Sequence, residues 1–483
     1  MKEVVVIGAG LAGCEAAYQL SKRGFSVKLY EQKPITRSDA HTLDGYAELV
    51  CSNSLKSTDM ATASGLLKAE LNHLDCLLLR LAKECSVPAG SALAVDRDKF
   101  SQLVTKTIQN LPNVTVHSQV VEHFDTSLPT IIATGPLTSG GLAKQIQELT
   151  DGFLDFFDAV SPIVEYDSID MNHAFVQDRY NKHGDKAKHN NSDATNIPDI
   201  SSTKLYESVS QSDVTCTDID ASDKSDGTDI SDENPITQGD YINCPLSKDE
   251  YDLFYSELVK AERVQPKEWE GVPYFDSCMP IEVIASRGQD TMRFGPLRPV
   301  GFTDPKTGKR PYAVLQLRKE NTLGNIYNLV GFQTSLKFGE QKRVFGLIPA
   351  LKDAEYVRYG VMHRNSFVNA PLVLDKHFAI KKHPNIYIAG QLSGLEGYME
   401  SIMSGLIAGI SMSNKLNDTP QLDFPLTTII GTLTDYITRP NSSYSPINAN
   451  FGILPPITGI RDKRERKLAY SKRAMLDMEN ITF

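Results

Sequence analysis

The chain has 483 residues, with 50 lysines and arginines against 60 aspartates and glutamates, and its formal net charge is −10. This length predicts two or three domains, and no apolar run reaches the roughly 18 residues that a membrane-spanning helix needs. If the negative charge were spread evenly, it would argue against a nucleic-acid partner, because phosphate contacts require positive surface.

The start of the chain predicts a dinucleotide-binding unit. Residues 2–7 are a short β-branched run that predicts a buried strand rather than a secretory signal. A helical pattern follows, with Glu15 at a place typical of flavoproteins, and then a second strand over 25–30. The glycine turn would approach a pyrophosphate at the helix N-terminus, and an acid after the second strand would accept from ribose hydroxyls. The expected contacts are Gly8, Ala9, Gly10, Leu11, Ala12, Gly13 and Glu31.

Two later strands that end in glycine favour FAD as the dinucleotide. They cover 130–135 and 385–390, and the second leads into a helix predicted over 399–414. The N-terminus of that helix would meet the flavin edge where negative charge develops on reduction. No second GxGxxG occurs, so NAD(P)H would visit the flavin without a domain of its own. The expected cofactor contacts in these segments are Thr134, Gly135, Gly390, Gln391, Glu396, Gly397 and Tyr398.

Two segments between these strands have distinctive residue patterns. Residues 65–84 carry leucines at helical spacing, which predicts one amphipathic core helix. Residues 181–238 hold ten Asp, two Glu and five Lys but no Phe or Trp, which predicts a flexible acidic insert. This segment carries −7 and leaves −3 for the rest of the chain, so a nucleic-acid partner is electrostatically permissible.

The cysteines indicate a reducing compartment. Their number is odd, no Cys-x-x-Cys pair occurs, and no Cys/His spacing matches a metal site, so we expect a cytoplasmic protein without a disulfide framework or a metal. We expect four of them to be buried structural residues. The seven are Cys14, Cys51, Cys76, Cys85, Cys216, Cys244 and Cys278, and the four expected to be structural are Cys14, Cys76, Cys85 and Cys244.

Five segments have distinctive sequences that are not general flavoprotein features, and they are 47–56, 85–97, 277–283, 309–314 and 359–365. Together they resemble one enzyme family, the folate- and FAD-dependent tRNA (uracil-5-)-methyltransferases, or TrmFO family. The resemblance keeps its order from Val4 to about Arg473. The family pattern has only a few residues between about 180 and 241, so the acidic insert is the departure.

The resemblance implies a fold, a reaction and its cofactors. The fold would be an α/β FAD-binding domain of the two-dinucleotide type, made of 1–150 and 330–483, with an α+β domain inserted over 151–329. FAD reduced by NAD(P)H would carry and reduce the one-carbon unit of 5,10-methylenetetrahydrofolate. The product would be 5-methyluridine in the T loop of tRNA (position 54). Nothing in the sequence predicts the oligomeric state or a membrane contact.

The chemistry of uracil methylation requires a reactive thiol and a base. Adding a thiolate to C6 makes C5 nucleophilic, and the C5 proton must later leave. The resemblance marks Cys278 as the thiolate and places Cys51 beside the flavin as base or second thiol, with the division of roles left open. Substrate contacts are expected from Gln333, His363, Arg364 and Asn365.

Two basic regions are candidate tRNA contacts. One contains Arg287, Arg293, Arg298, Lys309 and Arg310, and the other is the C-terminal segment 461–473, which carries +5 and is expected to be helical. In both regions the same residues could equally form a solvated face.

Other functions stay open on the sequence alone. They are a GidA-like FAD- and folate-dependent modification of a wobble uridine, a small-molecule flavin oxidoreductase, and a flavin-dependent scaffold that recruits a partner through its acidic insert. The extra C-terminal domain of the GidA-like proteins is not visible in the sequence. Deleting 181–238 separates an enzyme, which keeps its turnover, from a scaffold, which loses its partner.

Overall fold

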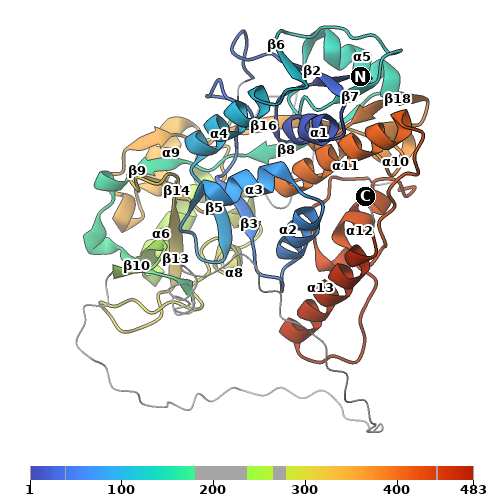
Figure 1. Cartoon of the computed structure of the whole chain (residues 1–483). Helices are drawn as coiled ribbons and strands as arrows, with labels where there is room; N and C mark the ends of the chain where they lie inside the picture. The colour runs from blue at the N-terminus through green and yellow to red at the C-terminus, as the bar shows by residue number, and fades with distance from the viewer. Residues whose placement is uncertain (1, 39, 180–236, 265–278, 442–443, 482–483) are drawn as a thin grey trace.

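The computed structural model describes residues 2–38, 40–179, 237–264, 279–441 and 444–481. The acidic insert, except for its last two positions, and the expected nucleophile Cys278 lie outside these residues. The described chain forms two units, each built around its own sheet (Figure 1). Within that part of the chain, no helix is long and apolar enough to cross a membrane.

The first unit contains a six-stranded sheet among the described residues, in the order β17-β18-β7-β1-β2-β6. Every neighbouring pair is parallel except β17–β18. Its central strand has valines at alternate positions that are fully buried, as the β-branched run predicts. The expected α/β class with a Rossmann-like sheet is therefore confirmed. The strands are β1 (Glu3–Ile7), β2 (Ser26–Glu31), β6 (Val114–Ser118), β7 (Thr130–Ile132), β17 (Ala379–Ile380) and β18 (His383–Ile388).

Helices from distant parts of the chain complete this unit. The two that pack most closely come from its beginning and its end, and they lie side by side beside the sheet (Figure 1). They are α1 (Leu11–Lys22) and α11 (Tyr398–Leu416). This unit also contains two helices between residues 63 and 84, described below, and α4 (Arg97–Gln109), α5 (Gly140–Thr150), α10 (Ala370–Val373), α12 (Ile429–Tyr436) and α13 (Lys463–Glu479), the last of which contains most of the basic C-terminal segment.

Two glycines, Gly13 and Gly405, allow other backbone segments to pack directly against α1 on two sides. A Cβ added at Gly13 would lie 1.8 Å from the carbonyl oxygen of Gly8, and one added at Gly405 would lie 2.1 Å from that of Ala12. No side chain tolerates such distances. The first turn of α1 is therefore fixed between the glycine turn and α11.

The single helix expected over 65–84 is wrong, because two helices occupy this region. They are α2 (Ala63–His73) and α3 (Leu77–Glu84). The chain turns at Asp75, whose φ of +56° is left-handed, and its carboxylate pairs with Lys22 and Arg80. The leucines are buried on both helices, so their spacing predicted the buried face correctly but gave no sign of the break.

Glu15 explains where the second of these helices begins. Its side chain is fully buried and accepts hydrogen bonds from the N–H groups of Leu77 (3.2 Å) and Leu78 (2.9 Å) at the start of α3. It also accepts from Gln19 Nε2 at 2.8 Å. Burial raises the pKa of Glu15, and these hydrogen bonds oppose the rise. This carboxylate therefore joins α1 to α3.

The second unit is built on a largely antiparallel sheet, in the order β11-β10-β12-β13-β14-β9-β15 among the described residues. The unit extends beyond the expected boundary at residue 329, because α9 and β15 follow that residue and pack with the second sheet and core. The strands are β9 (Ile163–Glu165), β10 (Phe175–Gln177), β11 (Thr237–Gln238), β12 (Tyr241–Leu246), β13 (Ala313–Lys319), β14 (Ile326–Leu329) and β15 (Tyr356–Arg358). The helices are α6 (Lys248–Lys260), α7 (Ile281–Ser286), α8 (Thr291–Phe294) and α9 (Phe338–Phe345).

Two smaller sheets connect the units. The chain leaves and re-enters the first unit through an antiparallel pair, β8 (Phe153–Ala159) and β16 (Met362–Val368). A small sheet of β3 (Ser54–Ser57), β4 (Ser86–Val87) and β5 (Ala92–Val95) faces the second unit. Asn53, just before β3, donates to the carbonyl of Lys319 at 2.8 Å and accepts from Arg318 Nε at 2.9 Å. These hydrogen bonds hold the loop before β3 against β13 of the second unit.

The close approach at α11 gives a test of the fold. Replacing Gly405 with Ala should destabilise the protein by about 1–3 kcal/mol, because the new methyl group overlaps the carbonyl of Ala12. The matched control is Gly339→Ala in α9, where an added Cβ meets nothing within 4 Å. The control should be neutral or stabilising by up to about 1 kcal/mol. Urea unfolding measures both, and equal stability of the two variants would contradict the packing argument.

Candidate functional site

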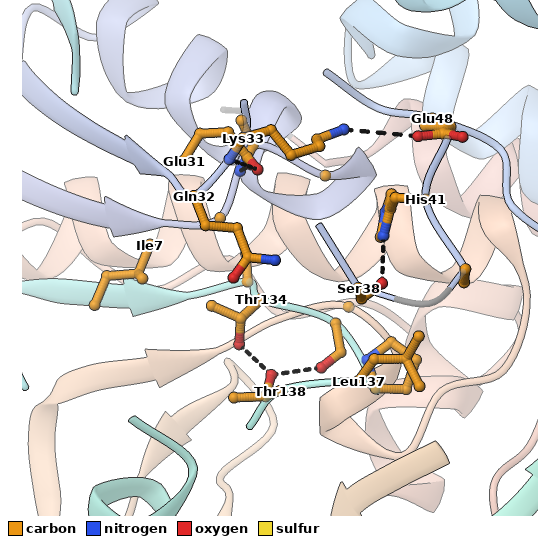
Figure 2. A pocket seen from close by; sticks show the side chains of 18 of the residues that line it. Ile7, Glu31, Gln32, Lys33, Ser38, His41, Glu48, Thr134, Leu137 and Thr138 are labelled. Atoms are coloured by element: carbon orange, nitrogen blue, oxygen red, sulfur yellow. Dashed lines mark hydrogen bonds and ion pairs between the residues drawn. The ribbon is translucent and has the colours of Figure 1, made fainter. Parts of the chain in front are cut away.

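A cavity of about 530 Å³ lies where the strands of the parallel sheet end at their carboxyl side. This is the edge at which ligands bind in open α/β sheets. Thirteen of the residues expected from the sequence line it. They are Gly8, Ala9, Gly10, Leu11, Ala12, Glu31, Cys51, Thr134, Gly135, Asn365, Gly390, Gln391 and Tyr398. Four separate parts of the sequence thus meet in one cavity (Figure 2).

The glycine turn is held by the acid at the end of β2. Glu31 is buried, and its two carboxylate oxygens accept from the N–H groups of Ala9 (2.8 Å) and Lys33 (3.0 Å). A carboxylate has about four acceptor positions, so both oxygens retain capacity for ligand hydroxyls. Gly8 has a φ of +99°, and a Cβ there would lie 2.6 Å from the carbonyl oxygen of Ala133. Only glycine fits this turn.

The backbone after the turn fits a pyrophosphate. Gly10 caps α1 without a side-chain hydrogen bond, and a Cβ built on it would approach only one atom, the Ala133 carbonyl oxygen at 3.9 Å. The backbone here therefore faces open space at the positive end of a helix dipole. Directly beside the turn, Thr134 and Thr138 share a hydrogen bond of 2.6 Å, and Thr138 donates to the carbonyl of Gly135 at 2.7 Å (Figure 2). The residues present suit a dinucleotide.

A polar wall beyond Glu31 was not anticipated from the sequence. Lys33 Nζ lies 3.8 Å from Glu48 Oε2, and both side chains are buried (Figure 2). Ser38 Oγ lies 2.6 Å from His41 Nδ1. Burial lowers the pKa of His41, and the neighbouring Lys33 lowers it further, so the imidazole is neutral at pH 7. The polar residues that directly follow the second strand in the sequence could have indicated this wall.

Cys51 sits at the cavity wall on a loop fixed by a tyrosine. The hydroxyl oxygen of Tyr398, at the start of α11, accepts from the N–H groups of Cys51 (2.6 Å) and Ser52 (3.1 Å). Burial, followed by the charge of Cys51, raises the pKa of Tyr398, so the phenol stays neutral. The Cys51 sulfur is half-buried and lies 3.9 Å from the carbonyl oxygen of Ala159 in β8. The two expected residues Cys51 and Tyr398 are thus direct partners.

Two arginines hold the same loop and were missed by the sequence analysis. Arg97 donates to the carbonyl of Leu49 at 2.9 Å, and Arg358 donates to that of Cys51 at 3.3 Å. Glu320, which is buried, pairs with Arg97 at 2.8 Å. Burial lowers the pKa of Arg358, and the charge of Arg97 lowers it further. These residues come from both units, and they place positive charge beside the Cys51 loop.

Several expected site residues lie elsewhere. Among the described residues, Gly13, Glu396, Gly397 and Gln333 are not part of the cavity wall. Glu396 accepts from Gln391 Nε2 at 2.6 Å, which orients a residue that does line the cavity. Gln333 accepts from the N–H of Ile281 through its carbonyl at 2.7 Å. The side chains of His363 and Arg364 in β16 lie outside the described residues, as does Cys278.

The other described cysteines differ from Cys51. Cys14, Cys76, Cys85 and Cys244 are all buried, and burial raises the pKa of each thiol. A buried thiol of this kind is chemically inert. Their structural role is therefore consistent with their surroundings. In the described part of the chain, no group of three His, Cys, Asp or Glu side chains could hold a metal ion.

The sequence is similar to one named group of enzymes over almost its whole length. A family model described as "Glucose inhibited division protein A" matches residues 3–228 and 214–420. The "Methylenetetrahydrofolate--tRNA-(uracil-5-)-methyltransferase TrmFO" of Acetivibrio thermocellus is 46% identical over 473 residues, covering 97% of this chain and 96% of its own. The protein of the same name from Bacillus velezensis is 45% identical over 482 residues, covering 99% and 98%.

A solved structure has the same fold. The GidA protein of Aquifex aeolicus, in its form II crystal, aligns with 99% of this chain and 72% of its own, with a TM-score of 0.64. Its form I crystal gives a TM-score of 0.63 and covers 75% of that chain. Both are 14% identical in sequence, so this likeness concerns the fold alone.

The tyrosine that fixes the Cys51 loop gives a second prediction. Tyr398→Phe leaves the N–H groups of Cys51 and Ser52 without their acceptor, which should cost about 1–3 kcal/mol of local stability. Hydrogen exchange of the peptide around residues 49–54 should therefore quicken by roughly tenfold or more. The control is Tyr436→Phe, which removes a hydrogen bond to the carbonyl of Ser445 (3.0 Å) at the surface. Unchanged exchange in Tyr398→Phe would show that the arginines hold the loop without the tyrosine.

Proposed function

The chain belongs to the TrmFO family, and from this premise we propose that it is a methylenetetrahydrofolate–tRNA-(uracil-5-)-methyltransferase that converts a T-loop uridine of tRNA to 5-methyluridine. The observation that carries the proposal is the 46% identity over 97% of the chain to a protein of that name. The geometry supports it, because the nucleotide-type turn and Cys51 line the same cavity. A GidA-like wobble-uridine activity has less support, since that likeness is 14% identical.

FAD is the cofactor that the cavity suits in this proposal. The backbone of the glycine turn would hold the pyrophosphate, Glu31 would accept from ribose hydroxyls, and the segments at Gly135 and Gly390 would border the flavin. Bound FAD, reduced by NAD(P)H, supplies the electrons and the carrier for the one-carbon unit of methylenetetrahydrofolate. These residues would hold the cofactor in the cavity whose wall also includes Cys51.

The protein must activate uracil, whose C5 is a poor nucleophile. A thiolate that adds to C6 makes C5 nucleophilic, and a base then removes the C5 proton before the thiolate leaves. We assign the thiolate to Cys278 and the second thiol or base to Cys51, on the family resemblance. Cys51 lies on the cavity wall, and the buried arginines and Tyr398 fix its loop. The target uridine must leave its stack to reach such a site.

The reaction gives a direct test. Flavin-loaded protein, undermodified tRNA, methylenetetrahydrofolate and NAD(P)H should yield 5-methyluridine on nucleoside analysis. Cys278→Ala and Cys51→Ala should each lower the rate at least about 100-fold, because each removes a reacting group. Cys244→Ala is the control, since its thiol is fully buried in the second unit, and it should keep its rate within about threefold.

The outcomes separate the claims. No 5-methyluridine from the loaded wild-type protein would refute the proposed function. A covalent adduct with 5-fluorouridine-containing tRNA that persists in Cys278→Ala would assign the C6 nucleophile to Cys51.

A further inference from the structure

A second cavity lies on the second unit and has no part in the site described above. Its volume is about 660 Å³, and it lies beside α8, before the start of β13. The positions of α8 and β13 are marked in Figure 1. It shares no residue with the first cavity. Its wall combines three arginines with two aromatic residues and is formed by Arg293, Phe294, Arg298, Pro299, Val300, Arg310, Pro311 and Tyr312.

The wall is firmly attached to the core beneath it. Met292 and Leu297 are fully buried, and the N–H of Leu297 donates to the carbonyl of Met292 at 2.9 Å. The carbonyl of Leu297 accepts from the N–H of Val314 in β13 at 3.1 Å. Between these anchors the Phe294 side chain is 82% exposed. The Phe294 ring is therefore exposed on a firmly anchored surface, where a ligand can contact it.

The arginines differ in how they are held. Arg293 donates to the carbonyl of Tyr312 at 2.9 Å, pairs with Asp290 at 2.7 Å, and lies over the Tyr312 ring at 3.6 Å. Its guanidinium is thus fixed in place. Arg298 and Arg310 are exposed, and within the described part of the chain neither guanidinium has a hydrogen bond or an ion pair. Residues 287–310 carry a net charge of +4, in a chain whose total is −10.

We propose that this second cavity binds the sugar–phosphate backbone of the tRNA substrate and that Phe294 stacks on an unpaired base. This inference rests on the proposed function and adds to it a contact surface outside the catalytic cavity. Arginine presents a planar fork of donors that matches a phosphate in two hydrogen bonds. Exposed aromatic rings between cations are the usual platform for unstacked RNA bases. A loop from which a uridine has been extruded offers both groups.

A second copy of the chain fits this surface poorly. Two-fold association places a patch against itself. The arginines of one copy would then face those of the other around a single exposed phenylalanine, and like charges brought together oppose association. A polyanion with planar bases matches both features of the cavity without this conflict.

The test measures binding separately from catalysis. Affinity of the full-length, flavin-loaded protein for undermodified tRNA is measured by fluorescence anisotropy over a range of salt concentrations. Arg298→Ala combined with Arg310→Ala should weaken binding at least about tenfold near 0.15 M salt and reduce the slope of log K against log salt by about 1.4–1.8. Phe294→Ala should weaken binding roughly tenfold with an unchanged slope, because stacking releases no counterions. KM for tRNA should rise in both variants while kcat at saturating tRNA stays constant.

Matched controls remove the same groups elsewhere. Lys106→Ala with Lys144→Ala deletes two exposed positive charges from the first unit, and Leu323→Ala deletes an apolar side chain that is also 82% exposed. Both controls should bind tRNA within about twofold of the wild type. The inference would be overturned if the cavity variants bound tRNA with the affinity and the salt dependence of the wild type. It would also be overturned if Phe294→Ala changed the oligomeric mass of the protein but not its affinity for tRNA. Wild-type protein that forms no 5-methyluridine refutes the proposed function instead, whatever the variants bind.

Discussion

The first turn of α1 is the most constrained place in the structure, because backbone lies against it on both sides. Gly13 leaves room for the carbonyl of Gly8, and Gly405 leaves room for that of Ala12. The glycine turn, α1 and α11 therefore form one closely packed assembly from segments that are far apart in the sequence. α11 begins with Tyr398, which holds the Cys51 loop. These two glycine contacts thus set the positions of both the nucleotide turn and the thiol.

Buried carboxylates connect this assembly to its surroundings. Glu31 holds the glycine turn, Glu15 caps α3, and Glu70 accepts from the N–H groups of Ile429 and Ile430 at the start of α12. Burial raises the pKa of Glu70 to about 8, against the effect of those two amide donors. Each carboxylate satisfies backbone donors that would otherwise be buried without a partner. The glycine turn and the starts of these helices are thus fixed by side chains distant in the sequence, and at α12 they act together with the local cap Thr428, which accepts from the N–H of Gly431.

The two units have separate functions in the proposed reaction. The first provides the cofactor cavity, and the second presents a basic, aromatic surface suited to RNA. They meet at the Cys51 loop, where Arg97 comes from the first unit, and Glu320 and Arg358 from the second. Glu320 is buried and the two arginines are partly buried, so removing one of these charges would leave the others poorly compensated. The chain's negative total charge conceals this arrangement, since the positive groups are local and seven of the ten net negative charges belong to residues 181–238.

The sequence by itself determined the parallel-sheet unit, its glycine turn and the part of the cavity wall that this turn and the strand ends form. These features arise from local rules: β-branched runs form strands, and a turn against a carbonyl admits only glycine. Only the tertiary structure decided the break at Asp75, the extension of the second unit to β15, and the arginines around Cys51. The leucine spacing is the same whether the segment forms one helix or two. Nothing in the local sequence around Arg358 on β15 indicates that its partner is a carbonyl group some 300 residues away. Contacts between distant segments depend on packing, which local patterns do not encode.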